Sequence, residues 1–123
     1  MEILLMSKKV TAKKPSLDKI TISKIMRTVP RNEGFQFYKG PGDSTGKVAT
    51  SLADFSEKVR TVDIRSVNFH FRRDEFEKWI RNTIGDVELS RRVGRIRKDV
   101  HGEKLRNEII QLAKTRLEEL KGM

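Results

Sequence analysis

The segment NFHFRR, residues 68–73, interleaves aromatic rings with guanidinium groups. Phe69 and Phe71 lead directly into Arg72 and Arg73. Exposed nucleobases stack on aromatic rings and on guanidinium planes, and each such stack contributes roughly 1–3 kcal/mol. Guanidinium groups also form charge-assisted hydrogen bonds with phosphates. The pattern therefore predicts non-covalent contact with a flat, negatively charged partner, unless the rings simply form the core of a small domain.

The same juxtaposition of a ring and a cation occurs at Tyr38-Lys39. We expect bases to stack on Tyr38, Phe71 and Trp79, the last of which lies at the edge of a helical apolar stripe. Unpaired strands offer free base faces, whereas duplex DNA hides them, so interleaved rings and arginines favour a single-stranded partner. The predicted nucleic-acid-binding residues are Tyr38, Lys39, Lys47, Arg65, Phe69, Phe71, Arg72, Arg73, Trp79, Arg91, Arg92 and Arg95.

A second basic segment, RRVGRIRK at residues 91–98, has five basic residues in eight and no acid. Val93 and Ile96 are expected to face the core, which leaves Arg91, Arg92, Arg95 and Lys98 exposed. Most such charge runs are solvated helix faces. The lack of compensating acids makes phosphate contact an equal alternative.

The chain offers little for catalysis. GPGDSTGK, residues 40–47, fails the spacing of a phosphate-binding loop, because Pro41 stands where glycine is needed and Val48 follows the lysine. The two histidines, His70 and His101, lie far apart without a carboxylate cluster, so no metal site is expected. His70 is interpreted as a packed or hydrogen-bonded residue. We therefore predict no enzyme activity, no catalytic residue, no metal and no cofactor.

Charge defines the class of partner. The 123 residues include 27 Lys and Arg against 17 Asp and Glu, a net charge of +10, and no cysteine. Such an excess attracts polyanions, of which nucleic acid is the commonest. The high charge content resembles thermophilic proteins. No stretch approaches the roughly 20 apolar residues of a membrane span, and the first residues do not form a signal peptide. A cytoplasmic, nucleoid-associated protein without membrane contact is expected.

Periodicity predicts one hairpin near the start of the folded region. A short helix is expected within residues 17–29. FQFYK, 35–39, alternates like a strand. GPGDSTG, 40–46, is predicted to be the loop, and KVAT, 47–50, the partner strand.

Helices should follow the hairpin. Ser51 is expected to cap a helix whose apolar residues are Leu52, Phe55, Val59 and Val62. Residues 64–71 fit either a strand or a helix. Asp74, with Glu77, should form a capping box for a helix that ends at Gly85, and Asp86 should cap the next one.

The last predicted helix runs from about Gly102 to Lys121 and has two adjoining apolar stripes. Residues 107–123 carry three basic and three acidic groups, so this helix lacks the excess charge of the rest. A second stripe is more than one core contact requires, and we expect it to pack on another subunit. The predicted oligomerisation residues are Leu105, Ile109, Ile110, Leu112, Ala113, Leu117 and Leu120.

The order of these motifs resembles the ThermoDBP-like (Thermoproteales-type) archaeal single-stranded DNA-binding protein family. The likeness lies in FQFY, TGKVATSLADF, VRTVDIRSVNFHFRRDEFEKWI, GD and GEKLRNEIIQLAKTRLEEL, over about residues 33–121. It implies a small antiparallel β-sheet packed with helices, not an OB-fold, and sequence-tolerant binding of single strands in a cleft or between subunits. Phe69, Phe71, Arg72 and Arg73 match its motif directly. It also implies assembly into a homodimer or homotetramer.

Taken together, these patterns predict an α+β protein with three parts: a basic arm (1–16), a nucleic-acid-binding body (17–101) and a C-terminal oligomerisation helix (102–123). The expected partner is single-stranded DNA, with RNA equally compatible because nothing reads the 2′-hydroxyl. The alternatives are a chromatin-type duplex binder, which would use the arm and residues 91–98, and an adaptor that contacts an acidic protein.

Overall fold

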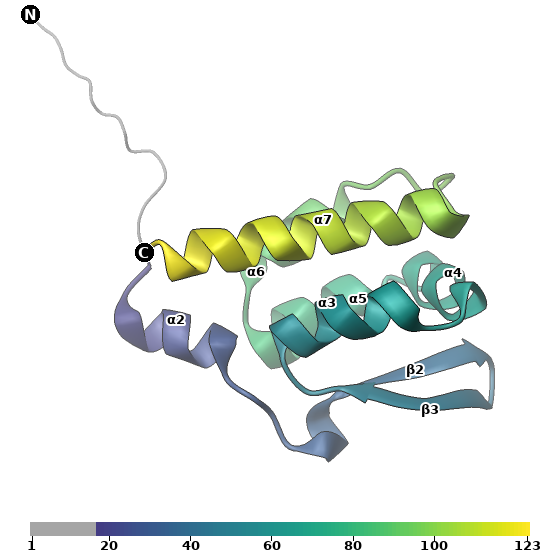
Figure 1. Cartoon of the computed structure of the whole chain (residues 1–123), viewed down its shortest axis with the longest axis horizontal. Helices are drawn as coiled ribbons and strands as arrows, with labels where there is room; N and C mark the ends of the chain where they lie inside the picture. Colours follow the sequence, from purple (N-terminus) through teal and green to yellow (C-terminus); the bar gives the residue numbers. More distant parts are fainter. Residues whose placement is uncertain (1–16) are drawn as a thin grey trace, which may run out of the picture.

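The computed structural model describes residues 17–123, so the predicted basic arm at 1–16 lies outside the described residues. These residues form an α+β fold, with a two-stranded antiparallel sheet and six α-helices. The elements lie in three layers: the hairpin, the central helices α3, α4 and α5, and then α6 and α7 (Figure 1). The predicted fold class is therefore confirmed.

The hairpin consists of β2 (Phe35–Gly40) and β3 (Asp43–Ala49), with Phe35 opposite Ala49 and Gly40 opposite Asp43. The predicted loop at 40–46 is wrong in length, because only Pro41 and Gly42 lie between the strands. Gly42 supplies the positive φ of 71° that such a tight turn needs. The Thr45 hydroxyl donates to the carbonyl of Phe37 at 2.7 Å, which holds β3 on β2 inside the segment predicted as loop.

Before the hairpin, α2 (Lys19–Met26) confirms the expected short helix ahead of Pro30, and a 3₁₀ turn, η1 (Arg31–Glu33), follows that proline. Asp18 caps α2 by accepting a hydrogen bond from the Thr21 N–H at 2.7 Å. Ile25 is the one residue of α2 that is fully buried. Arg27 anchors the end of α2 by donating to the carbonyls of Thr83 and Ile84.

The next two helices are α3 (Leu52–Thr61) and α4 (Ile64–Arg72). Ser51 caps α3 as predicted, since its hydroxyl accepts from the Asp54 N–H. The ambiguous segment 64–71 is a helix, with Val67 and Phe71 buried on one face at the spacing of one helical turn. Asp63 begins α4 by accepting from the Arg65 N–H.

A sharp corner at Asp74 separates α4 from α5 (Glu75–Trp79). The predicted capping box is wrong: Asp74 adopts a left-handed conformation with φ 59° and makes no side-chain cap. Its carboxylate instead pairs with Lys98, which also lies over the Phe71 ring. The helix continues as the π-helical η2 (Ile80–Ile84) and ends at Gly85, whose φ is 93°, as expected of a left-handed end residue.

The last layer contains α6 (Val87–Gly94) and α7 (Gly102–Lys121). Asp86 caps α6 as predicted. The two stripes of α7 are explained within one chain, because α7 packs on α3 and α4 with one side and on α6 with another. Of the predicted oligomerisation residues, five are buried inside the chain and Ile110 and Leu112 are partly buried against the same core; the five are Leu105, Ile109, Ala113, Leu117 and Leu120.

One core therefore joins residues 17–101 with residues 102–123, so the expected body and terminal helix are not separate folded units. Its densest part lies between the hairpin and the central helices, where Phe35, Phe37, Phe55, Phe76 and Trp79 contact one another. No helix within residues 17–123 is long and apolar enough to cross a membrane.

Candidate nucleic-acid interface

An open hollow of about 440 Å³ lies between the hairpin and the start of α5. Its size falls in the range of small-ligand sites, about 300–1,000 Å³. Four of the predicted binding residues line it, namely Tyr38, Phe69, Arg73 and Trp79. The other lining residues are Gly34, Phe35, Gln36, Gly40, Pro41, Gly42, His70 and Glu75.

His70 ties the hairpin to α4 at the floor of this hollow. Its Nε2 accepts a hydrogen bond of 2.8 Å from the backbone N–H of Tyr38, and its Nδ1 lies 2.8 Å from Oε1 of Glu75. Because Nε2 accepts, the proton lies on Nδ1 and is donated to Glu75. Burial lowers the pKa of His70, in spite of the neighbouring carboxylate. The imidazole is therefore neutral and structural, as interpreted from the sequence, and neither nitrogen is free to act as a base.

Arg73 and Phe69 form one wall of the hollow. The Arg73 guanidinium carbon lies 5.1 Å from the centroid of the Phe69 ring, a cation–π distance. Its Nε donates to Oε2 of Glu75 at 3.1 Å. Burial raises the pKa of Glu75, but the hydrogen bonds from His70 and Arg73 outweigh it and leave the pKa below its usual range. Glu75 is therefore ionised at neutral pH.

Arg65, Phe69 and Arg73 follow one another at intervals of four residues along α4 and at its end, so they share one side of the helix. Arg65 pairs with Asp63 at 2.8 Å and Lys39 with Asp43 at 3.7 Å. Exposed pairs of this kind contribute roughly 0–1 kcal/mol, so a phosphate could replace the acid at little cost. Arg72 and Lys47 are exposed and make no ion pair within residues 17–123.

Two of the rings that were expected to stack on bases, Phe71 and Trp79, are buried. Phe71 is only 2% exposed and packs in the core beneath Lys98, so it presents no face to a base. Trp79 is 9% exposed, and its indole N–H donates to the carbonyl of Glu33 at 2.9 Å. Trp79 therefore closes one end of the hollow from inside the core, whereas Tyr38 and Phe69 are the half-buried rings.

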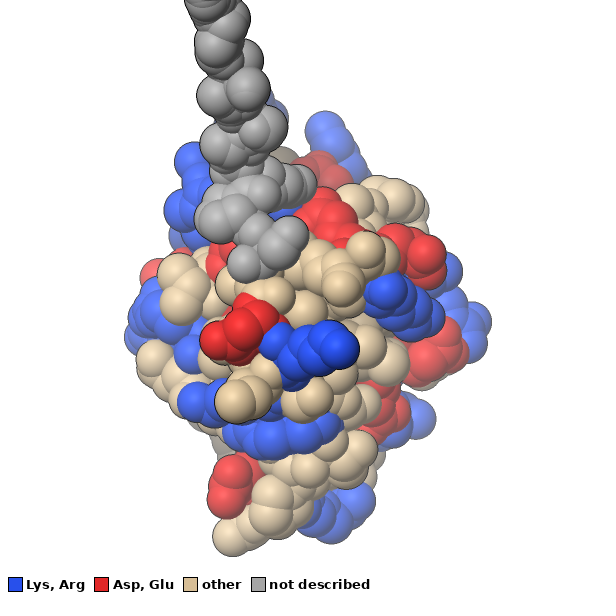
Figure 2. Space-filling model, turned by 90° about the vertical axis from the view of Figure 1, so that its left-hand side faces the viewer, with Lys and Arg blue, Asp and Glu red and all other residues tan. Residues whose placement is uncertain are grey.

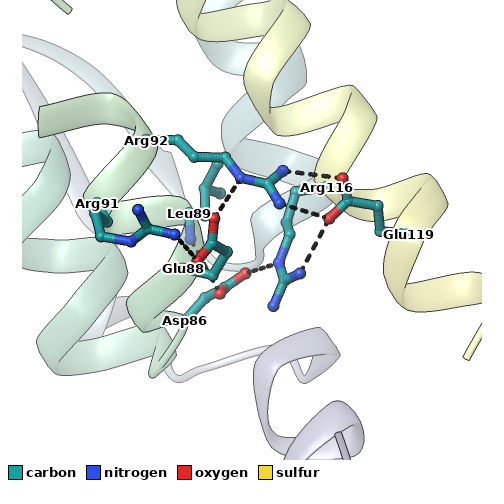
Figure 3. A network of polar contacts seen from close by, with 7 residues as sticks. All are labelled: Asp86, Glu88, Leu89, Arg91, Arg92, Arg116 and Glu119. Atoms are coloured by element: carbon teal, nitrogen blue, oxygen red, sulfur yellow. Dashed lines mark hydrogen bonds and ion pairs between the residues drawn. The ribbon is translucent and has the colours of Figure 1, made fainter. Parts of the chain in front are cut away.

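Two arginines of α6 are held by acids, Glu88 on the same helix and Glu119 on α7 (Figure 3). Arg92 is held by Glu88 on its own helix and by both carboxylate oxygens of Glu119 on α7, at 2.9 and 3.0 Å. Arg91 pairs with Glu88. Arg97 pairs with Asp99 and Lys98 with Asp74, so the expectation that residues 91–98 lack compensating acids is wrong for four of the five basic residues. Arg95 is exposed and makes no ion pair within residues 17–123.

The centre of this network is a buried ion pair between Arg116 and Asp86, with 2.8 Å between Nε and Oδ2 (Figure 3). Arg116 also donates to Glu119 at 3.1 Å. Since Asp86 caps α6 and Arg116 lies on α7, the pair fixes one helix against the other. None of these groups lines the hollow.

Other basic side chains serve the ends of helices. Arg106 donates to the carbonyls of Val59 and Val62 at 2.7 Å, at the end of α3. Arg27 does the same at the end of η2, and Lys98 lies 3.4 Å from the carbonyl of Phe71 at the end of α4. Cations are favourable at these negative ends of helix dipoles. These three cations therefore stabilise the fold through backbone carbonyls.

The remaining charges are interspersed on the face that Figure 2 shows, where lysines and arginines alternate with acids and no single basic patch forms. Across residues 17–123, no group of three or more potential metal-ligating side chains exists. The hollow brings the rings of Tyr38 and Phe69 together with the guanidinium of Arg73.

A family model matches residues 17–114 of the chain and is named DUF5752, a family of unknown function. This chain belongs to that family. The matched range includes both walls of the hollow and most of α7, so these elements belong to the DUF5752 unit. No curated protein and no solved structure matches the chain.

Sequence reasoning missed Glu75 as a member of the site. In the sequence, Glu75 directly follows Asp74, whose type fits a helix cap, so nothing local marks Glu75 as part of a binding site. Only the left-handed corner at Asp74 turns Glu75 back towards His70 and Arg73. Gln36 was also missed, since its position in FQFY indicates only an outward-facing strand residue.

Proposed function

We propose that this DUF5752 protein binds single-stranded nucleic acid, with DNA as the expected partner, at the hollow between the hairpin and α4. One observation carries the proposal: Tyr38 and Phe69, two half-buried rings from different elements, meet Arg73 at one open hollow. The resemblance to the ThermoDBP-like family supports the same function. No catalytic step and no cofactor is part of it.

In this proposal a base enters the hollow and stacks on Tyr38 or on the Phe69–Arg73 wall. The phosphates on either side contact exposed cations of α4 and the hairpin, of which Arg72 and Lys47 have no acid to displace within residues 17–123. Lys39 and Arg65 contribute after exchanging their exposed carboxylate partners for phosphate. The α6 arginines are not part of this contact, because Arg91 and Arg92 are held by acids and Arg95 lines the groove that is assigned below to self-association.

The hollow favours an unpaired strand over a duplex. A base in a duplex presents only its edges in the grooves, and its faces reach a ring only after unstacking, which costs a few kcal/mol per step. An unpaired base reaches the hollow without that cost. Because stacking tolerates any base, binding to most sequences is expected.

The test compares a labelled thymidine 20-mer with a duplex of equal length, by fluorescence anisotropy at several salt concentrations. The proposal expects tighter binding of the single strand and weaker binding as salt rises. Tighter binding of the duplex would support the chromatin-type alternative and overturn the proposal. Equal binding of a uridine 20-mer would extend the partner to RNA.

Self-association into a homodimer or homotetramer, and a cytoplasmic, nucleoid-associated location, belong to the same proposal. The core uses most apolar residues of α7, so we assign association to a groove between α6 and α7. Arg92, Arg95 and Ile96 line one side, and Glu108, Gln111 and Leu112 line the other. In two copies related by a twofold axis, Arg95 of each would face Glu108 of the other, which makes the groove self-complementary.

A further inference from the structure

Glu75 gives the hollow a feature that phosphate binding does not explain. A carboxylate that is ionised at neutral pH lies among the lining residues, beside two aromatic rings. Such a charge repels phosphate. It attracts a group that donates hydrogen bonds, and the edges of bases carry N–H donors.

Each oxygen of Glu75 has capacity left. Oε1 accepts from His70 at 2.8 Å and Oε2 accepts from Arg73 at 3.1 Å. A carboxylate oxygen can accept two hydrogen bonds, so both oxygens can take one more. The two existing bonds also hold the carboxylate in one orientation, which reduces the entropy lost when a ligand binds.

Arg73 leaves donors free next to this carboxylate. Within residues 17–123, its hydrogen bond to Glu75 uses Nε only, and its terminal nitrogens donate to no protein group. The hollow therefore presents one pair of acceptors and, beside it, one set of donors. The rings among its lining residues offer faces on which a flat ligand can stack.

We infer that the hollow reads the Watson–Crick edge of guanine, with Glu75 accepting from its N1–H and N2–H groups and Arg73 donating to its O6. Guanine is the one standard base with two adjacent N–H donors on this edge, which match the two oxygens of a carboxylate. Adenine and cytosine present one amino donor next to a ring acceptor. Thymine presents one N–H between two carbonyls. The inference rests on the proposed function and adds a guanine preference to it.

The test uses single-stranded heptamers of thymidine with a central guanosine, inosine, adenosine or thymidine, measured by fluorescence anisotropy at one salt concentration. Inosine retains O6 and N1–H and lacks only the amino group at position 2. A good bidentate contact to a base edge is expected to give at least about tenfold tighter binding of the guanosine heptamer than of the other three. This comparison needs no substitution, so it remains decisive if a variant fails to fold.

The Glu75→Gln substitution assigns the effect. The amide carries one acceptor and one donor, so it should abolish the guanine preference, measured as the ratio of the affinities for the guanosine heptamer and the all-thymidine heptamer. Glu57→Gln is the matched control, because it makes the same change on the exposed face of α3. The control should keep the full preference, and circular dichroism checks that both variants fold.

Three outcomes overturn the inference. Equal binding of all four heptamers by the unmodified protein excludes the guanine preference and leaves the proposed function in place. A preference that persists in Glu75→Gln excludes Glu75 as the group that reads guanine and also leaves the proposed function in place. If neither the heptamers nor the thymidine 20-mer bind, the proposed function fails and the inference fails with it.

Discussion

The backbone N–H of Tyr38 donates a 2.8 Å hydrogen bond to Nε2 of His70, which joins the exposed hairpin to helix α4. The bond requires an unprotonated Nε2. Glu75 holds the other nitrogen, so both the position and the tautomer of the ring are fixed. The shape of the hollow therefore depends on a neutral histidine.

The first prediction is a loss of stability on mild acidification. The unfolded histidine titrates near pH 6.5, whereas burial lowers the pKa of His70 in the fold. Between these two values the unfolded chain binds more protons, so the free energy of unfolding falls as the pH decreases below about 6.5. Urea unfolding between pH 7.5 and pH 5 measures this decline.

The His70→Gln substitution should flatten that dependence, because it removes the group that titrates. His101→Gln, which removes the exposed second histidine, should retain it. A decline of equal slope in the unmodified protein and in His70→Gln would show that another group is responsible. Carboxylates such as Glu75, whose pKa is lowered, act in a separate range below about pH 4.5.

The second prediction concerns the rings and cations of the hollow. Phe69→Ala should weaken binding of single strands about tenfold, since one stack contributes roughly 1–3 kcal/mol. Arg73→Gln should weaken binding and also reduce its salt dependence. Arg91→Gln, which changes an exposed arginine of α6, is the control and should have little effect. Anisotropy titrations across salt compare the three. Equal losses in Arg73→Gln and Arg91→Gln, with no loss in Phe69→Ala, would mean that charge alone binds the strand.

The third prediction tests the close approach of Gly34, which directly precedes β2, to Val48 and Ala49 of β3. A Cβ added at Gly34 would lie 2.6 Å from Cγ1 of Val48 and 2.7 Å from the carbonyl oxygen of Ala49. Gly34→Ala should therefore cost about 1–3 kcal/mol in the free energy of unfolding. Gly40→Ala, at the other end of β2 with open space around it, should cost less than about 1 kcal/mol. Urea denaturation measures the free energy of unfolding of both variants. Equal losses in the two would contradict the close contact at Gly34.

The fourth prediction concerns the buried ion pair at the junction of α6 and α7. Arg116→Met leaves the carboxylate of Asp86 buried without its partner, which should cost about 3–5 kcal/mol. Lys114→Met makes the same replacement on the exposed face of α7 and should be almost neutral. The midpoints of urea unfolding measure both effects. A small loss in Arg116→Met would indicate that water or Arg92 replaces the missing cation.

The fifth prediction tests self-association at the groove between α6 and α7. Sedimentation equilibrium should give the mass of a dimer or tetramer, and Leu112→Glu should give the monomer because it places a charge in the apolar floor. Lys114→Glu, on the exposed face of the same helix, should keep the assembled mass. A monomeric unmodified protein at every concentration would end this part of the proposal.

Local pattern determined most of the elements. Ser51, Asp86 and Gly85 acted at the helix ends as their side chains and backbone preferences predict, and the period of the apolar residues located α3, α6 and α7. These features depend on neighbours within a few residues, which is the range over which spacing carries information. The α+β class followed from them.

Contacts between distant segments decided the rest. How α4 packs against α7 and the hairpin decides which phenylalanine reaches solvent: Phe69 is half-buried and Phe71 is buried. The two stripes of α7 predict that part of this helix packs on another subunit. A sequence does not state how many neighbours a helix has within its own chain, and here α3, α4 and α6 cover α7. The sequence likewise predicts an exposed Arg92 without an acidic partner, because Glu119, which pairs with it, lies 27 residues away. Burial and ion pairing depend on which distant segments pack against each other, and only the tertiary structure shows those contacts.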